Sequence, residues 1–336
     1  MKIIFIVGSS RSGTTMLGRI FGNNSKVYTF GELHFFENLV DIETIINRHA
    51  LKLTKQIELL ERLLTTSREG LFSTVISGKY HKDIESILKQ SEGNDAVSLY
   101  KAFLLYETER NGKKIPCEQT PRYLFYAKEI LDLFPEAKII NMVRDPRDVL
   151  LSQKNKWRRR FLGARNIPPT EAIRAWANYH PYIIARLWRG AIRMAMQLEG
   201  HPRFISIRFE DLLRHPEEVI KHLCDFVGIE FEKNMLHVPQ VGSSLKEDRP
   251  NKFGIDSERA CAWQKGGLTS IEVAICQKVA LEEMEGFGYL PVQMNAPKIK
   301  YYITMGKFLL KGMISFFLNL KRTKNLRETI RRRLAR

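Results

Sequence analysis

Residues 8–15 read Gly-Ser-Ser-Arg-Ser-Gly-Thr-Thr, a glycine-bounded segment that lies between two regular elements. The apolar run 3–7, Ile-Ile-Phe-Ile-Val, predicts a buried parallel strand before it, and a helical pattern begins near Thr14. This order of strand, loop and helix is typical of a phosphate-binding loop, in which backbone N–H groups and the helix N-terminus face an anion. Thr14, Thr15 and the charged Arg11 add side-chain donors. The simpler alternative is a glycine-rich turn that binds nothing.

The loop departs at one position from the pattern G-x-x-x-x-G-K-[ST]. Thr14 stands where the lysine that reaches the β- and γ-phosphates of a nucleoside triphosphate is expected. We therefore expect a nucleotide with a different arrangement of phosphates.

A second polar constellation follows the apolar run 137–143, which predicts another buried strand. Arg144 at the strand end and Ser152 on the next helix can converge on a second phosphate. Taken alone, this segment is equally typical of a helix start with charged first-turn residues. Because strands alternate with helices along the chain, we predict an α/β fold with a parallel sheet, helices on both faces, and ligands at the carboxyl ends of the strands.

The length of 336 residues suits one large α/β domain. Residues 36–110 predict a helical insertion, residues 170–198 a long helix with Trp176 and Trp188 in its buried stripe, and residues 237–258 a long loop. The four cysteines are scattered, which argues against a disulfide framework or a zinc site and favours a reducing compartment.

These motifs resemble those of the sulfotransferases that use 3′-phosphoadenosine 5′-phosphosulfate (PAPS). Residues 8–15 resemble the loop that binds the 5′-phosphosulfate, and residues 143–152, Val-Arg-Asp-Pro-Arg-Asp-Val-Leu-Leu-Ser, resemble the segment that binds the 3′-phosphate. Residues 118–123, 134–138, 208–212 and 286–289 are similar to further elements of that family. The resemblance covers roughly residues 1–291 and is closer to the branch that acts on carbohydrates and protein tyrosines. It implies a P-loop NTPase-like sheet, a sulfotransferase domain over 1–296 and a tail over 297–336.

The resemblance also implies roles for individual residues. The reaction would pass a sulfuryl group from PAPS to an acceptor hydroxyl, without a metal. Arg11 would stabilise the departing phosphate and Glu32 would be the base, with His34 as a fallback; Glu32 as an ordinary surface or capping acid is the competing interpretation. The residues expected to bind PAPS are Ser10, Arg11, Ser12, Gly13, Thr14, Thr15, Arg144, Ser152 and Phe209.

Some positions differ from the family pattern. Gln119 stands where relatives often have a lysine, and Phe209 replaces a frequent tyrosine, which keeps a ring for stacking on adenine but removes a hydroxyl. A loop serine is expected to touch the transferring group, but Ser243, Ser244 and Ser257 are not distinguished by sequence. Lys156 and Lys265 are further candidates for phosphate contacts, although lysines of this kind are more often solvated.

The tail carries most of the net charge of +17. Residues 297–336 hold twelve Lys or Arg and one acidic residue, against 42 and 36 in the first 296. Helical spacing places a polar stripe on one side and apolar residues around the rest; the stripe is Lys300, Thr304, Lys307, Lys311, Ser315, Asn319 and Arg322. This pattern predicts a helix lying in a membrane interface, hence a cytoplasmic protein peripheral at the inner face of a membrane. Together with the resemblance to the carbohydrate and protein-tyrosine branch, the tail implies a carbohydrate or glycolipid acceptor. Packing on the protein's own body or an oligomer contact is the alternative. Nucleic-acid binding is disfavoured because few aromatic residues accompany the basic run 321–336.

Two other functions compete with sulfuryl transfer. An atypical P-loop kinase or nucleotidase would bind ATP with Mg²⁺, but it would need the missing lysine and a metal-binding acid, for which Asp145 is the nearest candidate. A non-catalytic, membrane-associated nucleotide-binding module would not need Arg11, Glu32, Arg144 and Ser152 together.

Overall fold

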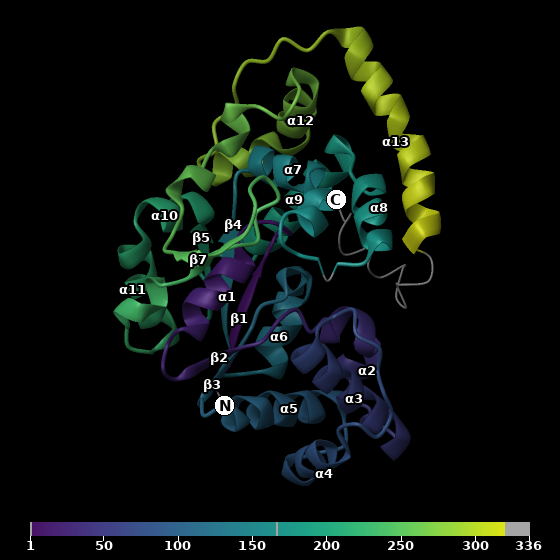
Figure 1. Cartoon of the computed structure of the whole chain (residues 1–336), viewed down its shortest axis with the longest axis vertical. Helices are drawn as coiled ribbons and strands as arrows, with labels where there is room; N and C mark the ends of the chain where they lie inside the picture. Colours follow the sequence, from purple (N-terminus) through teal and green to yellow (C-terminus); the bar gives the residue numbers. More distant parts are fainter. Residues whose placement is uncertain (1, 166, 320–336) are drawn as a thin grey trace.

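A five-stranded sheet forms the centre of the protein (Figure 1). The computed structural model describes residues 2–165 and 167–319. The strand order is β2-β3-β1-β4-β5, and each neighbouring pair is parallel. The strands are β1 (Ile4–Gly8), β2 (Val27–Thr29), β3 (Ile115–Glu118), β4 (Lys138–Val143) and β5 (Phe204–Arg208). The predicted α/β class, with a central parallel sheet flanked by helices, is confirmed.

The central strand β1 is apolar throughout because it is covered on both faces. Alternate residues of a strand point to opposite sides of the sheet. Phe5 packs into a core shared with the helices that follow β2, whereas Ile4 and Ile6 pack into a second core. That second core is shared with helices α1 (Thr14–Gly22), α10 (Phe209–Arg214) and α11 (Pro216–Val227).

Helices occupy the chain between β2 and β3, where the sequence predicts a helical insertion. They are η1 (Phe35–Leu39), α2 (Ile42–Ile46), α3 (Leu53–Glu69), α4 (His81–Gln90) and α5 (Ala96–Arg110). The stripe that includes Leu60, Leu63 and Leu64 is fully buried against the sheet core. In Figure 1 these helices lie together beside the edge formed by β2 and β3.

The predicted long helix over 170–198 is wrong in one respect. It is two helices, α8 (Pro169–Ala177) and α9 (Pro181–Met196), because Pro181 has no N–H to continue the first and holds His180 extended. Trp188 is buried as predicted, but Trp176 is 56% exposed, since the break turns α8 away from the core.

The remaining elements complete the second half of the chain. They are η2 (Pro121–Tyr126), α6 (Ala127–Leu133), α7 (Pro146–Lys154), η3 (Lys156–Phe161), η4 (Lys233–Leu236), β6 (Pro239–Gln240), β7 (Arg249–Phe253), η5 (Ser257–Arg259), η6 (Ala262–Lys265) and α12 (Ser270–Gly286). The loop predicted over 237–258 contains the antiparallel hairpin β6–β7, which we call the hairpin.

Helix α13 (Lys298–Asn319) follows the last core helix and packs along α8 and α9 (Figure 1). Within the described residues, no helix has the length and apolarity required to cross a membrane. Arg322, the last member of the predicted polar stripe, lies outside the described residues.

Candidate active site

The phosphate loop, residues 8–15, is held tightly between β1 and its neighbours. A Cβ on Gly8 would lie 2.5 Å from the carbonyl oxygen of Met142, and a Cβ on Gly13 would lie 2.4 Å from the ring of Phe209. Gly13 also has φ of 97°, a conformation that favours glycine. The two glycines are therefore required by close approach of the backbone to β4 and α10.

The donors predicted for an anion lie at this loop. Thr14 and Thr15 form the first turn of α1, so their N–H groups have no partner within the helix. Ser12 is buried, and its hydroxyl oxygen has no hydrogen-bond partner among the described residues. A buried hydroxyl without a partner at a helix N-terminus suits a bound anion.

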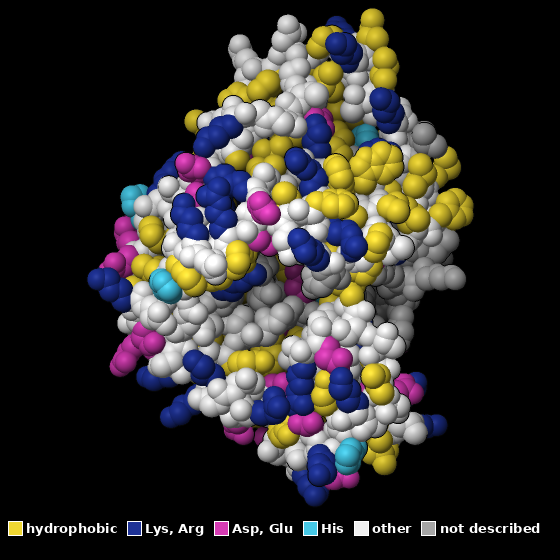
Figure 2. All heavy atoms as spheres, in the orientation of Figure 1, with side chains coloured by type: hydrophobic (Ala, Val, Ile, Leu, Met, Phe, Trp, Pro, Cys, Tyr) yellow, Lys and Arg dark blue, Asp and Glu magenta, His cyan; other side chains and the backbone are white. Residues whose placement is uncertain are grey.

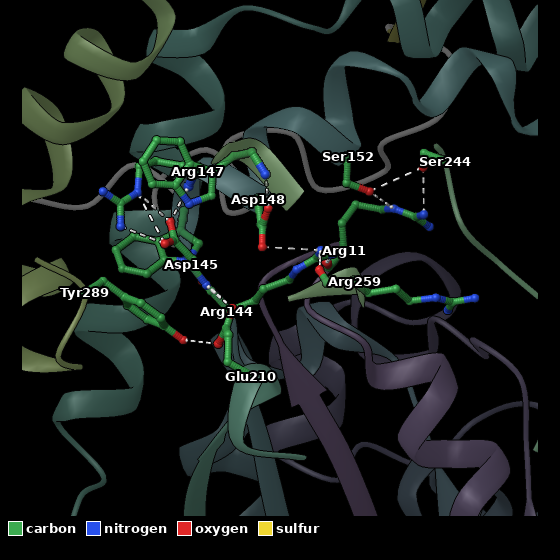
Figure 3. Close-up of polar contacts among 12 residues, drawn as sticks. Arg11, Arg144, Asp145, Arg147, Asp148, Ser152, Glu210, Ser244, Arg259 and Tyr289 are labelled. Atoms are coloured by element: carbon green, nitrogen blue, oxygen red, sulfur yellow. Dashed lines mark hydrogen bonds and ion pairs between the residues drawn. The ribbon is translucent and has the colours of Figure 1, made fainter. Parts of the chain in front are cut away.

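Arg11 joins three segments that are far apart in the sequence (Figure 3). Its Nε donates to the hydroxyl of Ser152 at 3.0 Å, and its Nη2 donates to the hydroxyl of Ser244 at 2.8 Å and to the carbonyl of Gly242 at 3.0 Å. The phosphate loop, helix α7 and the hairpin region thus meet at one guanidinium. Of the three candidate loop serines, Ser244 is the one that contacts Arg11.

Arg144 lies on the other side of Arg11. Its Nη1 donates to the carbonyl of Arg11 at 3.2 Å, and its Nη2 donates to the carbonyl of Arg259 at 3.1 Å and lies 3.6 Å from a carboxylate oxygen of Asp148. The Nε of Arg144 is buried without a hydrogen-bond partner among the described residues. Arg144 and Ser152 are therefore brought to the same place, each through a different contact with Arg11.

The ring of Phe209 packs against the guanidinium of Arg144. The ring is 3% exposed, its edge lies against Gly13, and the Arg144 guanidinium carbon lies 4.6 Å from its centroid. Because Arg144 lies over one face of the ring, Phe209 helps to position Arg144, and its predicted stacking on adenine stays a prediction.

A buried network holds Arg144 and its strand end in place (Figure 3). Asp145 caps α7 and pairs with Arg147 at 2.7 Å, and the Asp145 N–H donates to Glu210. The hydroxyl of Tyr289 donates to the other oxygen of Glu210 at 2.7 Å. Asp145 is therefore engaged in capping α7 and in an ion pair with Arg147. Residues 2–165 and 167–319 contain no group of three metal-ligating side chains.

Glu32 lies at the same edge of the sheet, after β2. One of its carboxylate oxygens lies 3.2 Å from Nε2 of His34, whose Nδ1 lies 3.3 Å from the buried carboxylate of Glu37. Desolvation lowers the pKa of His34, but hydrogen bonds and charges of the two carboxylates outweigh it and raise that pKa to about 9. Desolvation likewise raises the pKa of Glu32, but the hydrogen bond and charge of His34 bring it below its usual range.

These shifts assign different states to the two base candidates. The raised pKa of His34 favours its protonated form at neutral pH, and both ring nitrogens face carboxylates, so His34 is a poorer proton acceptor than Glu32. Glu32 is ionised, and its side chain is 40% exposed. Glu32 is therefore the better base candidate of the two, and both roles stay predictions. Sequence reasoning missed Glu37, whose only signal was its position three residues after His34.

A buried carboxyl fixes the loop that carries Glu32. Glu118 at the end of β3 accepts from the N–H of Leu33 at 3.2 Å and from the N–H of Thr120 at 2.9 Å. Burial raises the pKa of Glu118 to about 8. The adjacent Gln119, at the position where relatives often have a lysine, lies against Gly18 of α1, where a Cβ on Gly18 would come 3.1 Å from Gln119 Cγ. Its side-chain oxygen is buried without a hydrogen-bond partner among the described residues.

Basic residues surround Arg11, and two of them, Arg159 and Arg259, were not singled out by the sequence. Burial, and the charges of Arg144, Arg159 and Arg259, lower the pKa of Arg11 to about 10. Desolvation within the site, and the charges of Arg11 and Arg122, lower the pKa of Lys156 to about 8, although part of this residue is exposed. Arg159 lies in η3 and Arg259 in η5, short helical turns that are too brief to carry a periodic signal. Such crowding of like charges indicates a site for a multiply charged anion.

Comparison with known proteins matches most of the chain to one family, the sulfotransferases. A model of the sulfotransferase family matches residues 4–233. A putative protein-tyrosine sulfotransferase of Caenorhabditis briggsae is 27% identical over 240 residues, which cover 70% of this chain and 69% of that protein. Sulfotransferase 2A1 of Macaca fascicularis is 26% identical over 169 residues, 47% of this chain and 56% of that enzyme.

Among solved structures, the sulfotransferase domain from the Synechococcus PCC 7002 olefin synthase superposes with a TM-score of 0.52 at 24% identity, covering 86% of this chain and 95% of that one. This likeness shows the fold. The chain spans 56% of the macaque enzyme and 35% of a matching uncharacterized protein of Aquifex aeolicus, less than two-thirds of either relative. Since the family model covers more than half of the chain, from β1 to the start of η4, the chain belongs to the sulfotransferase family.

Proposed function

We propose that the protein transfers a sulfuryl group from PAPS to an acceptor hydroxyl. The observation that carries the proposal is Arg11, whose side chain joins the phosphate loop to Ser152 and whose carbonyl is held by Arg144. One guanidinium thus lies between two anion-binding segments, with Glu32 near enough to influence its pKa. PAPS carries two separate anionic groups, and family membership supports this donor.

The chemistry of the donor set fits this co-substrate. The unpartnered hydroxyl of Ser12 and the loop residues Ser10, Gly13, Thr14 and Thr15 would hold the phosphosulfate. The unpartnered Nε of Arg144, with Ser152, would hold the 3′-phosphate. The ring of Phe209 would position Arg144, whose guanidinium lies over it.

The proposed reaction is an in-line transfer. The acceptor oxygen forms a bond to sulfur while the bond between sulfur and the 5′-phosphate oxygen breaks, and its electron pair leaves with adenosine 3′,5′-bisphosphate. Glu32 takes the acceptor proton, and Arg11 offsets the negative charge that develops on the leaving phosphate. His34 is a positioning residue, because its charge keeps Glu32 ionised and its two contacts fix the carboxylate.

We propose a carbohydrate or glycolipid as the acceptor. Lys156 and Arg122 lie near enough to Glu32 to lower its pKa, and such polar surroundings suit a polyhydroxyl acceptor. The name of the nematode relative points to a protein tyrosine as the alternative hydroxyl. We further propose peripheral contact of residues 297–336 with a membrane surface.

Adenosine 3′,5′-bisphosphate is expected to raise the melting temperature more than ATP with Mg²⁺ does. At a hundred times the dissociation constant the bound state gains about 2.7 kcal/mol, which for a chain of this size is roughly 5 °C. Differential scanning calorimetry of the full chain with each nucleotide measures the order. The Arg144→Ala variant is the control, because it removes one proposed phosphate contact and should lose most of the shift. A larger shift with ATP and Mg²⁺ would favour the kinase alternative.

Turnover is expected to fall as pH rises through about 9. The raised pKa of His34 means that its protonated form is favoured in the folded protein, so its contribution is complete below the ordinary value of 6.5 and disappears above about 9. The measurement is a pH profile of kcat. Lys156, with its pKa near 8, also titrates in this range, so His34→Gln and Lys156→Met are compared. If His34→Gln keeps the wild-type alkaline limb, the proposed role of His34 is wrong.

A further inference from the structure

Helix α13 docks on the body through part of the polar stripe that the sequence placed toward solvent or lipid headgroups. The Nζ of Lys311 donates to the carbonyl of Tyr179 at 2.9 Å, and the hydroxyl of Ser315 donates to Asn178 at 2.7 Å. The ring of Phe308 lies 5.7 Å from that of His180, centroid to centroid. The expected orientation of Lys311 and Ser315 is therefore reversed, because α8 and α9 offer polar groups at their junction.

As a result, apolar side chains of α13 face outward. Seven of them are between 40% and 75% exposed: Ile299, Tyr302, Ile303, Met313, Ile314, Phe317 and Leu318. The helix also carries four lysines and no acidic residue. A solvent-exposed helix face that is largely apolar and carries several lysines is unusual in a monomeric soluble protein.

This face continues onto η3 and α8, and we call the whole the outer apolar surface. Its further members are Trp157, Phe161, Ile173 and Trp176, which are between 38% and 69% exposed. Figure 2 shows apolar side chains gathered where Figure 1 places α8 and α13, with Lys and Arg side chains among them. Two of the four tryptophans of the chain lie here, while Trp188 and Trp263 are 1% and 7% exposed.

The short helix η3 links this surface to the candidate active site. Lys156, its first residue, lies near enough to Arg11 and Glu32 to have its pKa shifted by both. Arg159 donates to the carbonyl of Ser243 at 2.8 Å, next to the serine that contacts Arg11. Trp157 and Phe161 of the same helix contact each other on the outer apolar surface.

We propose that the outer apolar surface docks on a bilayer containing anionic lipid, so that η3 and the site behind it meet acceptor hydroxyls carried by lipid headgroups. The second half of this inference rests on the proposed function. Exposed tryptophans beside lysines are typical of proteins seated at the membrane interface. Residues 321–336 add eight Lys or Arg and one Glu in the sequence, which strengthens the attraction to anionic headgroups. A second copy of the chain fits less well, because its α13 would bring lysines against lysines.

The test uses the full chain and its own tryptophans. Vesicles of phosphatidylcholine with phosphatidylglycerol are expected to pellet the protein, to shift its tryptophan emission to shorter wavelength and to permit quenching by brominated lipid. Vesicles of phosphatidylcholine alone are expected to bind about tenfold more weakly, since the electrostatic attraction is missing. Because Trp188 and Trp263 are buried, the change reports Trp157 and Trp176.

Two variants test whether both elements belong to the surface. Ile303→Glu on α13 and Phe161→Glu on η3 are each expected to weaken vesicle binding about tenfold. Ile76→Glu is the matched control, because Ile76 is 58% exposed and lies in the helical insertion. If the wild type does not bind anionic vesicles, or if Ile303→Glu and Phe161→Glu both bind them as the Ile76→Glu control does, the inference is wrong. Dimers in sedimentation that Ile303→Glu dissociates, without vesicle binding, would assign the surface to a second copy.

Calorimetry with adenosine 3′,5′-bisphosphate separates this inference from the proposed function. All three variants should keep the nucleotide-induced rise in melting temperature, because the exchanged side chains lie outside the nucleotide-binding residues. Vesicle binding without any nucleotide effect would remove the proposed function and leave the docking surface. A nucleotide effect without vesicle binding would do the reverse.

Discussion

Replacing Glu32 with Gln is expected to reduce kcat by roughly 10²–10⁴-fold, the range in which a positioned general base contributes. The change is isosteric but removes the proton acceptor. Affinity for adenosine 3′,5′-bisphosphate should stay within about twofold, since the ion-pair partner of Glu32 is His34, which is not one of the proposed nucleotide-binding residues. Single-turnover kinetics at saturating PAPS, with calorimetry for binding, separates the two quantities.

Two further variants distinguish a catalytic role of Glu32 from a positioning role. Glu37→Gln removes one of the two carboxylates that hold His34 and keeps Glu32, so its loss of turnover should be smaller. Glu58→Gln changes an exposed carboxylate on α3 and should leave turnover unchanged. Full activity of Glu32→Gln would remove Glu32 as the base. Equal losses in Glu32→Gln and Glu37→Gln would indicate that Glu32, too, acts only by positioning.

Replacing Arg11 with Ala is expected to reduce kcat by roughly 10²–10³-fold, as for removal of a charged donor from a developing negative charge. Unlike Glu32→Gln, this variant should also weaken binding of adenosine 3′,5′-bisphosphate. The guanidinium also donates to Ser152 and Ser244, whose hydroxyl oxygens lie 3.3 Å apart, so its loss weakens the contact between α7 and the hairpin region. Turnover at saturating PAPS and nucleotide affinity are both measured.

Arg11→Lys and Ser244→Ala divide these contributions. A lysine keeps the charge but cannot contact Ser152 and Ser244 through two nitrogens in a fixed fork, so its turnover should lie between those of the wild type and Arg11→Ala. Ser244→Ala leaves the charge and removes one neutral contact, for which about tenfold is expected. If Arg11→Ala is no worse than Ser244→Ala, the guanidinium only anchors the hairpin region and does not act on the leaving group.

The central sheet and the places of Arg11, Arg144 and Ser152 could be predicted from sequence because they depend on short-range patterns. A strand buried on both faces is apolar throughout, and a phosphate loop has fixed glycine spacing. Once two parallel strands are adjacent, as β1 and β4 are, the residues after both strands lie at one edge. Local spacing was therefore sufficient for these positions.

The helix boundaries near prolines were less predictable. The apolar period continues across Pro181, but the missing N–H and the extended His180 separate α8 from α9. Trp176 has the same periodic signal as a buried residue and is exposed, because burial depends on which surfaces the two helices find. Periodicity describes one helix and carries no information about a neighbour.

The sequence by itself determined the parallel α/β sheet, the phosphate loop that lacks its lysine, and Arg11 as the charged residue of that loop. Only the tertiary structure decided that the pKa of His34 is raised, that Ser244 rather than Ser243 contacts Arg11, that the carbonyl of Arg259 accepts from Arg144, and that α13 turns apolar side chains outward. The physical reason is that spacing along the chain fixes local backbone geometry, whereas a pKa, a long-range hydrogen bond or the exposed side of a helix depends on groups that folding brings from elsewhere in the chain.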